Sequence, residues 1–342
     1  MGMDQTTTRS IIRTSDRGRF KRCRTQWDFE SPMRQGYRYT PGIKALDFGI
    51  AVHVALEIFY DPDRLHYPRA QREGFALRAF TDSCNQQRAR ILLAQPSLAV
   101  ETEQDFAERE ILGKGMLEHY FLWSVEHDNF KPVKSEVEFE VPIPGMNACY
   151  QGRIDLIIEN EQGIWIVDHK TAAQFTNTAY MDLDMQVSSY CWAIRKQLGI
   201  PVEGVIINEL RKSVPKEPQV NQNGTMSQNK SQRTSAIMFR KKLAELGLSE
   251  DPYTEYIEHL EQRSIFFRRT TLYRGQEELD IVEQLIKLEA EDMLDPNVRI
   301  YPNSNRFNCN GCAFFAPCLA KLDGSDFEWI LEKSGRYTTE KY

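Results

Sequence analysis

Two apolar runs joined by a short polar turn constrain the fold of this chain more than any other feature. They are residues 152–158, Gly-Arg-Ile-Asp-Leu-Ile-Ile, and residues 164–170, Ile-Trp-Ile-Val-Asp-His-Lys. Apolar runs of this length around a turn that contains Asn and Gly predict a β-hairpin. Because side chains alternate along a strand, Asp168 and Lys170 lie on one face of the second strand and His169 lies on the other.

Each strand of this hairpin carries an aspartate, Asp155 in the first and Asp168 in the second. Burying a carboxylate without a partner costs several kcal/mol, so each aspartate needs a counter-charge or a ligand. A divalent cation shared by the two aspartates, beside the ammonium of Lys170, would supply one, and phosphodiester hydrolysis requires such an arrangement. A simple Asp–Lys ion pair on the sheet is the alternative at this point.

Helices are expected on both sides of the hairpin in the sequence. Residues 185–194 have apolar positions at helical spacing, and Gln186 and Tyr190 are four residues apart, so they share one face. Both side chains can form hydrogen bonds with phosphate oxygens or with an attacking water. Upstream, His53 falls on the inward stripe of another predicted helix, which turns its imidazole toward the protein interior.

These four motifs, in this order and spacing, resemble the PD-(D/E)xK nucleases of the RecB type. The matching segments are Gly49-x-x-x-His53, Gly152-Arg-Ile-Asp155, Asp168-His-Lys170 and Gln186-x-x-x-Tyr190. The resemblance implies an α/β fold with a restriction-endonuclease-like core, in which helices flank a central mixed sheet, together with a helical insertion. It also implies a metal-dependent DNA nuclease, an exonuclease rather than an endonuclease, that acts on single-stranded or frayed ends in recombination, repair or genome processing.

The resemblance assigns a role to each motif. One or two Mg²⁺ or Mn²⁺ ions would be held by the side chains of His53, Asp155 and Asp168 and by the main-chain carbonyl of His169. Lys170 would orient the attacking water or stabilise the developing charge, and Gln186 and Tyr190 would position the scissile phosphate. The family pattern includes a further acid, for which three positions stay open: Glu57, Glu136 and Glu138.

Four of the seven cysteines indicate a metal or iron–sulfur centre. Three cluster as Cys309-x-x-Cys312-x-x-x-x-x-Cys318, and Cys23 lies near the other end of the chain. A Cys-x-x-Cys turn presents two thiolates to one metal, and spacing alone favours zinc. One cysteine near the N-terminus and three near the C-terminus resemble the iron–sulfur nucleases, which include the AddB nuclease domain and the fourth CRISPR-associated exonuclease family. That resemblance implies a [4Fe–4S] cluster that joins the two terminal segments.

Two alternatives stay open beside a nuclease. One is a non-catalytic DNA-binding partner of a recombination or CRISPR-adaptation complex, and the other is a zinc-stapled protein without a role on nucleic acid. The intact set of Asp155, Asp168 and Lys170 argues against the first, because a scaffold has no reason to retain costly buried charges. No Gly-x-x-x-x-Gly-Lys-Ser/Thr motif is present, so any unwinding of DNA would need a helicase or recombinase partner.

The positive charge is local. The net charge of −6 is wrong for a protein that coats DNA, but a basic stretch follows a strand expected at residues 205–210. It enters a segment at 213–235 that is rich in Pro, Asn, Gln and Ser, which we expect to form a flap over the site. Cations of this kind can track phosphates without reading sequence, although a solvated basic surface is the simpler alternative. The residues expected to contact DNA are Arg211, Lys212, Lys230, Arg233, Arg268 and Arg269.

The expected organisation follows from these motifs. Residues 1–18 are interpreted as a disordered basic tail, whose arginines could also contact phosphates, and residues 19–41 carry the first cluster cysteine. Residues 42–132 should be mostly helical, and residues 133–275 should form the nuclease core. Residues 276–342 should hold an amphipathic helix and the three-cysteine segment.

Composition adds the setting. No stretch approaches the roughly 18 apolar residues of a membrane span, and no signal peptide is recognised, so we expect a cytoplasmic protein. The chain is longer than the compact CRISPR-associated members of the family need, which favours a stand-alone viral or mobile-element relative. The oligomeric state does not follow from the sequence.

Overall fold

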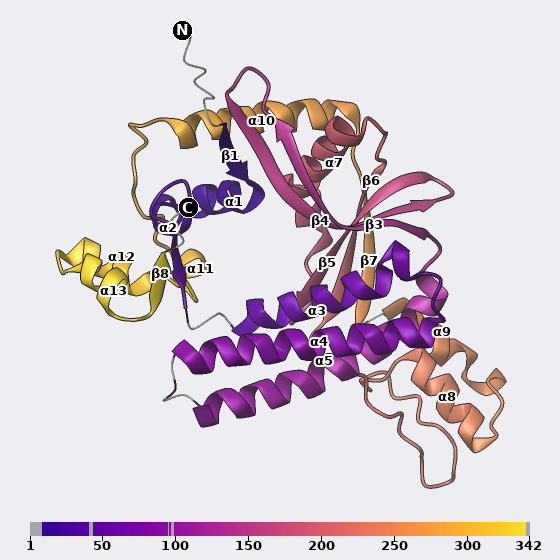
Figure 1. The fold of residues 1–342 in the computed structure, drawn as a ribbon. Coiled ribbons are helices and arrows are strands. Elements are labelled where there is room, and N and C mark those ends of the chain that lie inside the picture. Colours follow the sequence, from indigo (N-terminus) through magenta and orange to yellow (C-terminus); the bar gives the residue numbers. More distant parts are fainter. Residues whose placement is uncertain (1–8, 41–43, 95, 97–98, 264, 340–342) are drawn as a thin grey trace.

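A mixed β-sheet lies at the centre of the computed structural model, which describes residues 9–40, 44–94, 96, 99–263 and 265–339 (Figure 1). The strand order is β1-β4-β5-β6-β7, and β3 pairs with β4. These strands are β1 (Ser10–Arg13), β3 (Lys131–Pro142), β4 (Ala148–Asn160), β5 (Gly163–Ala172), β6 (Gly204–Arg211) and β7 (Phe267–Tyr273). Helices flank the sheet, so the chain has a mixed α/β fold consistent with the expected restriction-endonuclease-like core.

The predicted hairpin is present as β4 and β5. The two strands pair antiparallel up to Leu156, which lies opposite Val167. Beyond that pair they separate, and β1 pairs in parallel with residues 148–151 of β4. β3 pairs with β4 over nearly its full length and therefore occupies the other edge. Asp155 directly precedes Leu156, the first residue of β4 that pairs with β5, so it lies where these two strands separate.

Three long helices cover one face of the sheet. They are α3 (Lys44–Tyr60), α4 (Arg69–Ala94) and α5 (Ala99–His127), and they fill the region expected to be mostly helical. Leu156, Ile158 and Val167 point from the hairpin into this layer and pack with buried aromatic side chains such as Phe59 and Phe80. The alternation of side chains along β4 and β5 therefore supplies this apolar layer from one face of the sheet.

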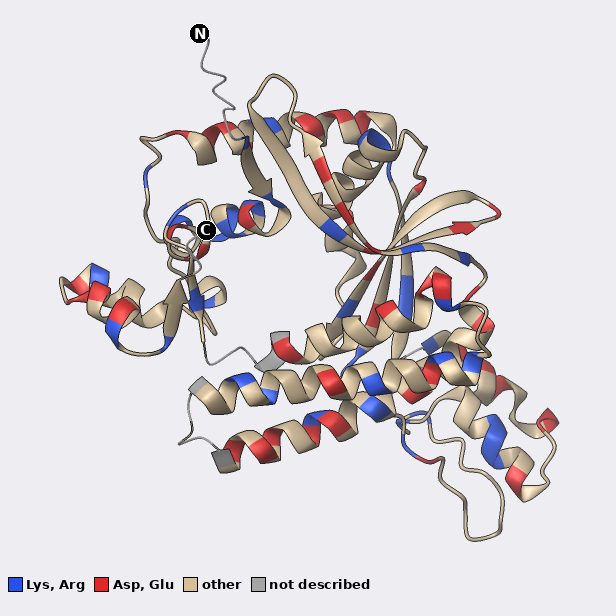
Figure 2. Cartoon of the chain, in the orientation of Figure 1, with Lys and Arg blue, Asp and Glu red and all other residues tan. Residues whose placement is uncertain are grey.

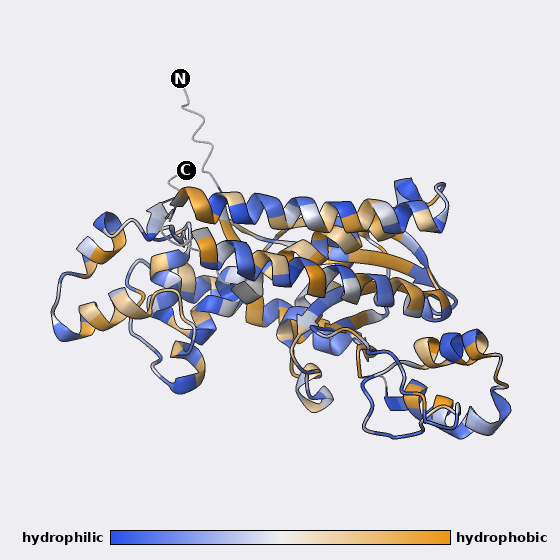
Figure 3. Cartoon of the chain, turned by 90° about the horizontal axis from the view of Figure 1, so that it is seen from below, coloured by the Kyte–Doolittle hydropathy of each residue, from blue (hydrophilic) through white to orange (hydrophobic). Residues whose placement is uncertain are grey.

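A second layer packs on the opposite face. It contains α7 (Met185–Leu198) and α10 (Gln276–Leu294), and Ile157 and Ile166 of the hairpin contribute to its apolar core. Figure 3 shows strands of the sheet coloured as apolar between helices whose apolar and polar segments alternate. The short helix α6 (Thr178–Met181) precedes α7. Asp184 caps the start of α7 by accepting the main-chain N–H of Gln186.

The N-terminal segment departs from the expected disordered tail. Residues 1–8 lie outside the described residues, but 10–18 form β1 and the first half of α1 (Thr14–Arg22). The prediction was wrong for 10–18 because Ile12 pairs with β4 and is fully buried, while the arginines around it suggested a solvated run. Figure 2 shows the Lys and Arg residues of α1 beside the sheet.

The two ends of the chain lie together. α2 (Arg24–Glu30) and β2 (Tyr37–Tyr39) meet the C-terminal helices α11 (Arg306–Cys309), α12 (Phe315–Asp323) and α13 (Phe327–Lys333). β2 pairs antiparallel with β8 (Tyr337–Thr339), and Phe29 packs against Phe314 in a small separate core. The joining of the terminal segments that was expected from the cysteines is therefore made by the polypeptide itself.

The segment between β6 and β7 forms a further unit. The expected flap continues into α8 (Ala236–Leu246) and α9 (Thr254–Arg263), and the unit has its own core around Phe239 and Tyr256. Two 3-10 turns complete the described elements, η1 (Pro62–Arg64) and η3 (Asp251–Tyr253). None of the helices described for this chain combines the length and apolar character needed to cross a membrane.

Candidate active site

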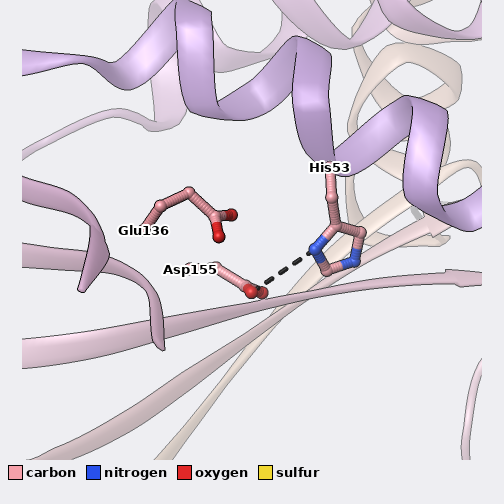
Figure 4. A group of neighbouring side chains, drawn as sticks. All are labelled: His53, Glu136 and Asp155. Atoms are coloured by element: carbon pink, nitrogen blue, oxygen red, sulfur yellow. Dashed lines mark ion pairs between the residues drawn. The ribbon is translucent and has the colours of Figure 1, made fainter. Parts of the chain in front are cut away.

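One group of metal-binding side chains forms where β4 leaves β5. His53 on α3, Glu136 on β3 and Asp155 on β4 each offer a ligand atom, and these atoms all lie within 4.8 Å of one another (Figure 4). His53 Nδ1 is 3.4 Å from Asp155 Oδ1. Two carboxylates and one imidazole are suitable ligands for a hard divalent cation, with the nitrogen favouring Mn²⁺. This is the candidate metal centre.

Two glycines let the elements approach closely enough to form it. A Cβ atom at Gly49 would lie 3.3 Å from Thr171 Oγ1, so α3 approaches the end of β5. At Gly152 a Cβ atom would lie 2.5 Å from both the Phe139 ring and Thr14 Oγ1, a distance that real Cβ atoms do not reach. Both glycines belong to the sequence motifs that pointed to the site, and their structural reason is close packing.

Of the three glutamates that the sequence left open, Glu136 is the one whose carboxylate belongs to this group. Its φ of 47° is the one positive value at a non-glycine position of the described chain, and the pairing of β3 with β4 stays regular on both sides of it, at Ser135 and Val137. Its side chain is 13% exposed and contacts Arg153 at 2.6 Å, whereas Glu138 and Glu140 face solvent. The sequence could not rank the candidates, because the choice depends on which residue of β3 lies beside Asp155 in the sheet.

The charge of the site depends on burial and on neighbouring groups. Burial, together with the nearby Asp155 and Glu57 carboxylates, raises the pKa of Glu136 to about 7 despite the opposing Arg153. Burial is the largest single influence and opposes the charged forms of both His53 and Asp155, but their mutual hydrogen bond and the attraction of neighbouring charges together outweigh it. The pKa of His53 is therefore raised and that of Asp155 is lowered. A bound cation would displace the protons of Glu136 and His53, and it would find the Asp155 carboxylate already ionised.

Asp168 is adjacent to this group but is not part of it. Lys170 Nζ lies 2.8 Å from Asp168 Oδ2 and 3.1 Å from Oδ1, on the same face of β5 as expected. Burial by itself lowers the pKa of Lys170, but the Asp168 carboxylate dominates and raises it. Glu136 is the further acid grouped with Asp155, Asp168 pairs with the ammonium, and a metal ion shared by Asp155 and Asp168 stays a prediction.

His169 contributes through its backbone, and its side chain lies in the opposite layer. Its main-chain N–H donates to Asp155 Oδ2 at 2.7 Å. Its buried ring stacks on Tyr60, and Nδ1 lies 2.9 Å from the amide nitrogen of Asn208. Burial lowers the pKa of His169 to about 3, so the ring is neutral. The N–H contact was not foreseen, and the expected role of the carbonyl stays a prediction.

Gln186 and Tyr190 lie together on α7 as their spacing indicated. Gln186 Nε2 donates to the Tyr190 hydroxyl at 2.6 Å. Burial and the Asp168 charge raise the pKa of Tyr190, so it remains a neutral hydrogen-bonding group. The Gln186 carbonyl accepts from Ser189 Oγ, which is 2.8 Å from the Tyr150 hydroxyl of β4. The two residues expected to position phosphate are thus tied to the hairpin.

The basic residues expected to contact DNA divide into two sets. Arg269 is 14% exposed and donates to Asp128, while Arg268 donates to the fully buried Glu209. Their donors are used inside the protein, which argues against a contact with DNA, and that contact stays a prediction.

The remaining four basic residues stay predicted DNA contacts. Lys230 and Arg233 are exposed in the flap, and Arg233 donates to Ser213 Oγ at 2.6 Å. Arg211 donates to the Ala173 carbonyl at 3.0 Å, and Lys212 lies over the Phe48 ring at 5.2 Å.

The four motif cysteines lie near one another between the terminal segments. Burial and the thiols of Cys23, Cys312 and Cys309 raise the pKa of Cys318, which reports their proximity. The main-chain N–H of Asn303 donates to Cys23 Sγ at 3.4 Å. The cysteine sulfurs are nevertheless not gathered within 4.8 Å as the His53 group is.

The fold and the site together define a class of protein: a hydrolase with an acidic metal centre at the opening of a mixed sheet, beside an aspartate–lysine pair. The model of the PD-(D/E)XK nuclease superfamily matches residues 15–318, and the chain belongs to this superfamily of nucleases. A solved structure titled "Crystal structure of SSO0001" is 18% identical, with a TM-score of 0.31, over 69% of this chain and 81% of that chain. No curated protein matches the chain. Membership accounts for the acidic centre, because these nucleases use divalent ions such as Mg²⁺ or Mn²⁺.

Proposed function

We propose that the chain is a metal-dependent DNA exonuclease that hydrolyses phosphodiester bonds at single-stranded or frayed ends. The observation that carries the proposal is the convergence of His53, Glu136 and Asp155 within 4.8 Å of one another. The ion pair of Asp168 and Lys170 lies on the strand beside them. A recombination, repair or genome-processing role, with a helicase or recombinase partner for unwinding, fits an enzyme that acts on ends.

Each side chain has a separate task in this proposal. His53, Glu136 and Asp155 hold one Mg²⁺ or Mn²⁺ ion, and Asp168 is placed to become a ligand if Lys170 turns toward the phosphate. A bound ion supplies a water of lowered pKa and neutralises phosphate charge. The Lys170 ammonium orients that water or stabilises the charge that develops on the phosphate. The Gln186 amide and the Tyr190 hydroxyl hold the phosphate oxygens.

The test uses anaerobically purified protein with 5′- and 3′-labelled single- and double-stranded oligonucleotides, with Mn²⁺, with Mg²⁺ and with chelator. We expect stepwise shortening of one labelled end with metal only. Lys170→Met should abolish it while the protein stays folded, and Lys333→Met on α13 serves as the matched control. DNA binding without cleavage under any metal would support the non-catalytic alternative. Internal cuts in a circular single strand would identify an endonuclease.

We further propose that Cys23, Cys309, Cys312 and Cys318 hold a [4Fe–4S] cluster. Four thiolates are the ligand set that such a cluster takes, and the pKa of Cys318 is raised in part by Cys23, Cys312 and Cys309, so the four thiols are close enough to interact. The N–H that Asn303 donates to Cys23 is the kind of contact that tunes such clusters. Its task is architectural, because it would staple segments that already pack together.

Metal analysis separates this cluster from the zinc alternative. We expect about four iron atoms and equivalent sulfide per chain, with the broad visible absorbance of an iron–sulfur protein. Cys23→Ser should lose both, and Cys84→Ser, at a buried thiol remote from the centre, should keep them. A colourless preparation with one zinc per chain would contradict the proposed iron–sulfur cluster. It would leave the nuclease proposal unaffected.

A further inference from the structure

A cavity of about 930 Å³ extends from the candidate metal centre to the N-terminal helix. Asp155 lies at one end of it, and Gln186 and Tyr190 form one side. Arg13, Thr14, Arg17, Gly18 and Lys21 line its other wall along α1. The segment that was expected to be a disordered tail therefore forms part of the surface around the site.

The α1 wall is cationic. Arg13 makes no ion pair within the described part of the chain, and Arg17 and Lys21 share one counter-charge, Glu289 of α10. The acids that also line the cavity are Glu138, Asp155 and Asp184. Arg17 is 3% exposed, and its Nη2 atom has no hydrogen-bond partner among the described residues. Arg17 therefore contributes positive charge behind the wall, while Arg13 and Lys21 are the cations of this wall that a bound anion could contact.

This wall is held rigidly against the catalytic helix. Thr14 Oγ1 donates to the Tyr150 hydroxyl at 2.9 Å, and Tyr150 is 2.8 Å from Ser189 Oγ. Ser189 in turn donates to the Gln186 carbonyl. The network links α1, β4 and α7, so the cations keep a fixed position relative to the residue expected to hold the scissile phosphate.

The cavity offers no platform for bases. Its aromatic lining residues, Tyr150 and Tyr190, are buried, and their hydroxyls are already used in hydrogen bonds. Proteins that read or stack bases present exposed aromatic faces, whereas proteins that track a backbone present cations. The lining therefore suits sugar and phosphate, and it gives no basis for sequence preference.

We propose that this cavity binds the sugar–phosphate backbone of one DNA strand, with Arg13 and Lys21 contacting phosphates next to the one that is cleaved. The inference rests on the proposed nuclease function and adds the path of the substrate. It gives the enzyme a single-strand groove on the α1 side of the metal centre. The predicted flap contacts would then lie at a second, separate surface.

The test measures binding of fluorescent single-stranded and duplex oligonucleotides in chelator, which prevents hydrolysis, over a range of salt. A single strand releases about 0.7 counterion per phosphate contact, so Arg13→Gln with Lys21→Gln should lower the slope of log affinity against log salt by about 1.4. The loss should be the same for poly-dT and poly-dC. Arg78→Gln, on the exposed side of α4, is the matched control and should change nothing.

A second variant shows whether a loss of DNA binding could be caused by unfolding. Glu289→Gln removes the counter-charge of Arg17 and Lys21 and should strengthen single-strand binding, which an unfolded protein cannot do. An unchanged slope in the double variant, or a loss confined to duplex, would overturn the groove. Because binding is read without cleavage, a protein that binds through these residues yet cuts nothing would refute only the nuclease.

Discussion

Asp155 Oδ2 accepts the main-chain N–H of His169 at 2.7 Å, across the point where β4 and β5 separate. The hydrogen bond fixes one carboxylate oxygen to the neighbouring strand and leaves the other to face His53. A main-chain donor cannot be lost by substitution, so the orientation of Asp155 is built into the hairpin. The charge of Asp155 pairs with His53 in this structure and is available to a metal ion at the same place.

This relationship predicts the outcome of Asp155→Asn. The amide can still accept the His169 N–H, so the protein should stay folded, although loss of the His53 ion pair should lower its thermal midpoint. Metal affinity and cleavage should both fall at least about a hundredfold, because even outer partners of metal ligands cost 10–100-fold. Isothermal titration with Mn²⁺ and the labelled-oligonucleotide assay measure the two quantities. Full cleavage by the variant would remove Asp155 from the centre.

A second prediction concerns pH. The pKa of Glu136 is about 7, so its carboxyl is mostly protonated at pH 6 and mostly ionised at pH 8. A cation must displace that proton, and apparent Mn²⁺ affinity should rise about tenfold between these values from this group alone. The raised pKa of His53 acts in the same direction.

Glu136→Gln isolates this contribution. The variant should bind Mn²⁺ more weakly, and the pH dependence of its affinity should lose the Glu136 part while keeping the His53 part. Glu138→Gln, two residues along the same strand and exposed, is the control. An affinity in the parent protein that stays flat from pH 6 to pH 8 would contradict the placement of Glu136 at the metal.

The motif spacing was sufficient to predict the elements that carry the chemistry. Apolar runs and helical spacing predicted the hairpin, the helix of Gln186 and the helix of His53, and each is present with its charged residues on the predicted side. These features depend on local periodicity, which a single sequence displays directly. Asp168 and Lys170 belong to this class, since their shared face follows from alternation alone.

What the sequence did not reveal depends on contacts between distant segments or on local backbone geometry. Glu136 reaches the centre because its neighbours Ser135 and Val137 pair with Leu156 and Ile154 of β4, on either side of Asp155, and the pairing of two strands is not visible in the sequence. Arg269 was expected at DNA, yet its partners Asp128 and Tyr120 come from the helical layer and are visible only after folding. The role of Ile12 in burying β1 was masked by the basic residues around it.

A third prediction follows from the neutral ring of His169. Burial lowers its pKa from the ordinary 6.5 to about 3, so between these values the unfolded chain binds a proton that the folded chain does not. Stability therefore falls as pH drops below about 6.5, and at pH 5.5 the loss from this group is about 1.5 kcal/mol. Above pH 7 it contributes nothing.

Urea unfolding in chelator at pH 5.5 and pH 7.5 tests this. His169→Gln should be less stable than the parent at both values, because the contact with Asn208 changes, but its difference between the two should be smaller by about 1.5 kcal/mol. Other titrating groups are common to both proteins and cancel in the comparison. Equal differences for parent and variant would mean that the ring titrates normally in the folded state.

The last prediction tests the structural role assigned to Arg269. Its guanidinium donates to Asp128, to the His127 carbonyl and to the hydroxyl of Tyr120, and both members of the ion pair are 14% exposed. Arg269→Met leaves Asp128 without its counter-charge, and breaking such a pair costs about 3 kcal/mol. Urea unfolding should show this loss, whereas Arg78→Met, at an exposed site, should stay within about 0.5 kcal/mol of the parent. The salt dependence of DNA binding should be unchanged in Arg269→Met, since the side chain does not reach a phosphate. If the Arg269→Met variant has normal stability and a smaller salt dependence of DNA binding, Arg269 contacts DNA and lacks the structural role.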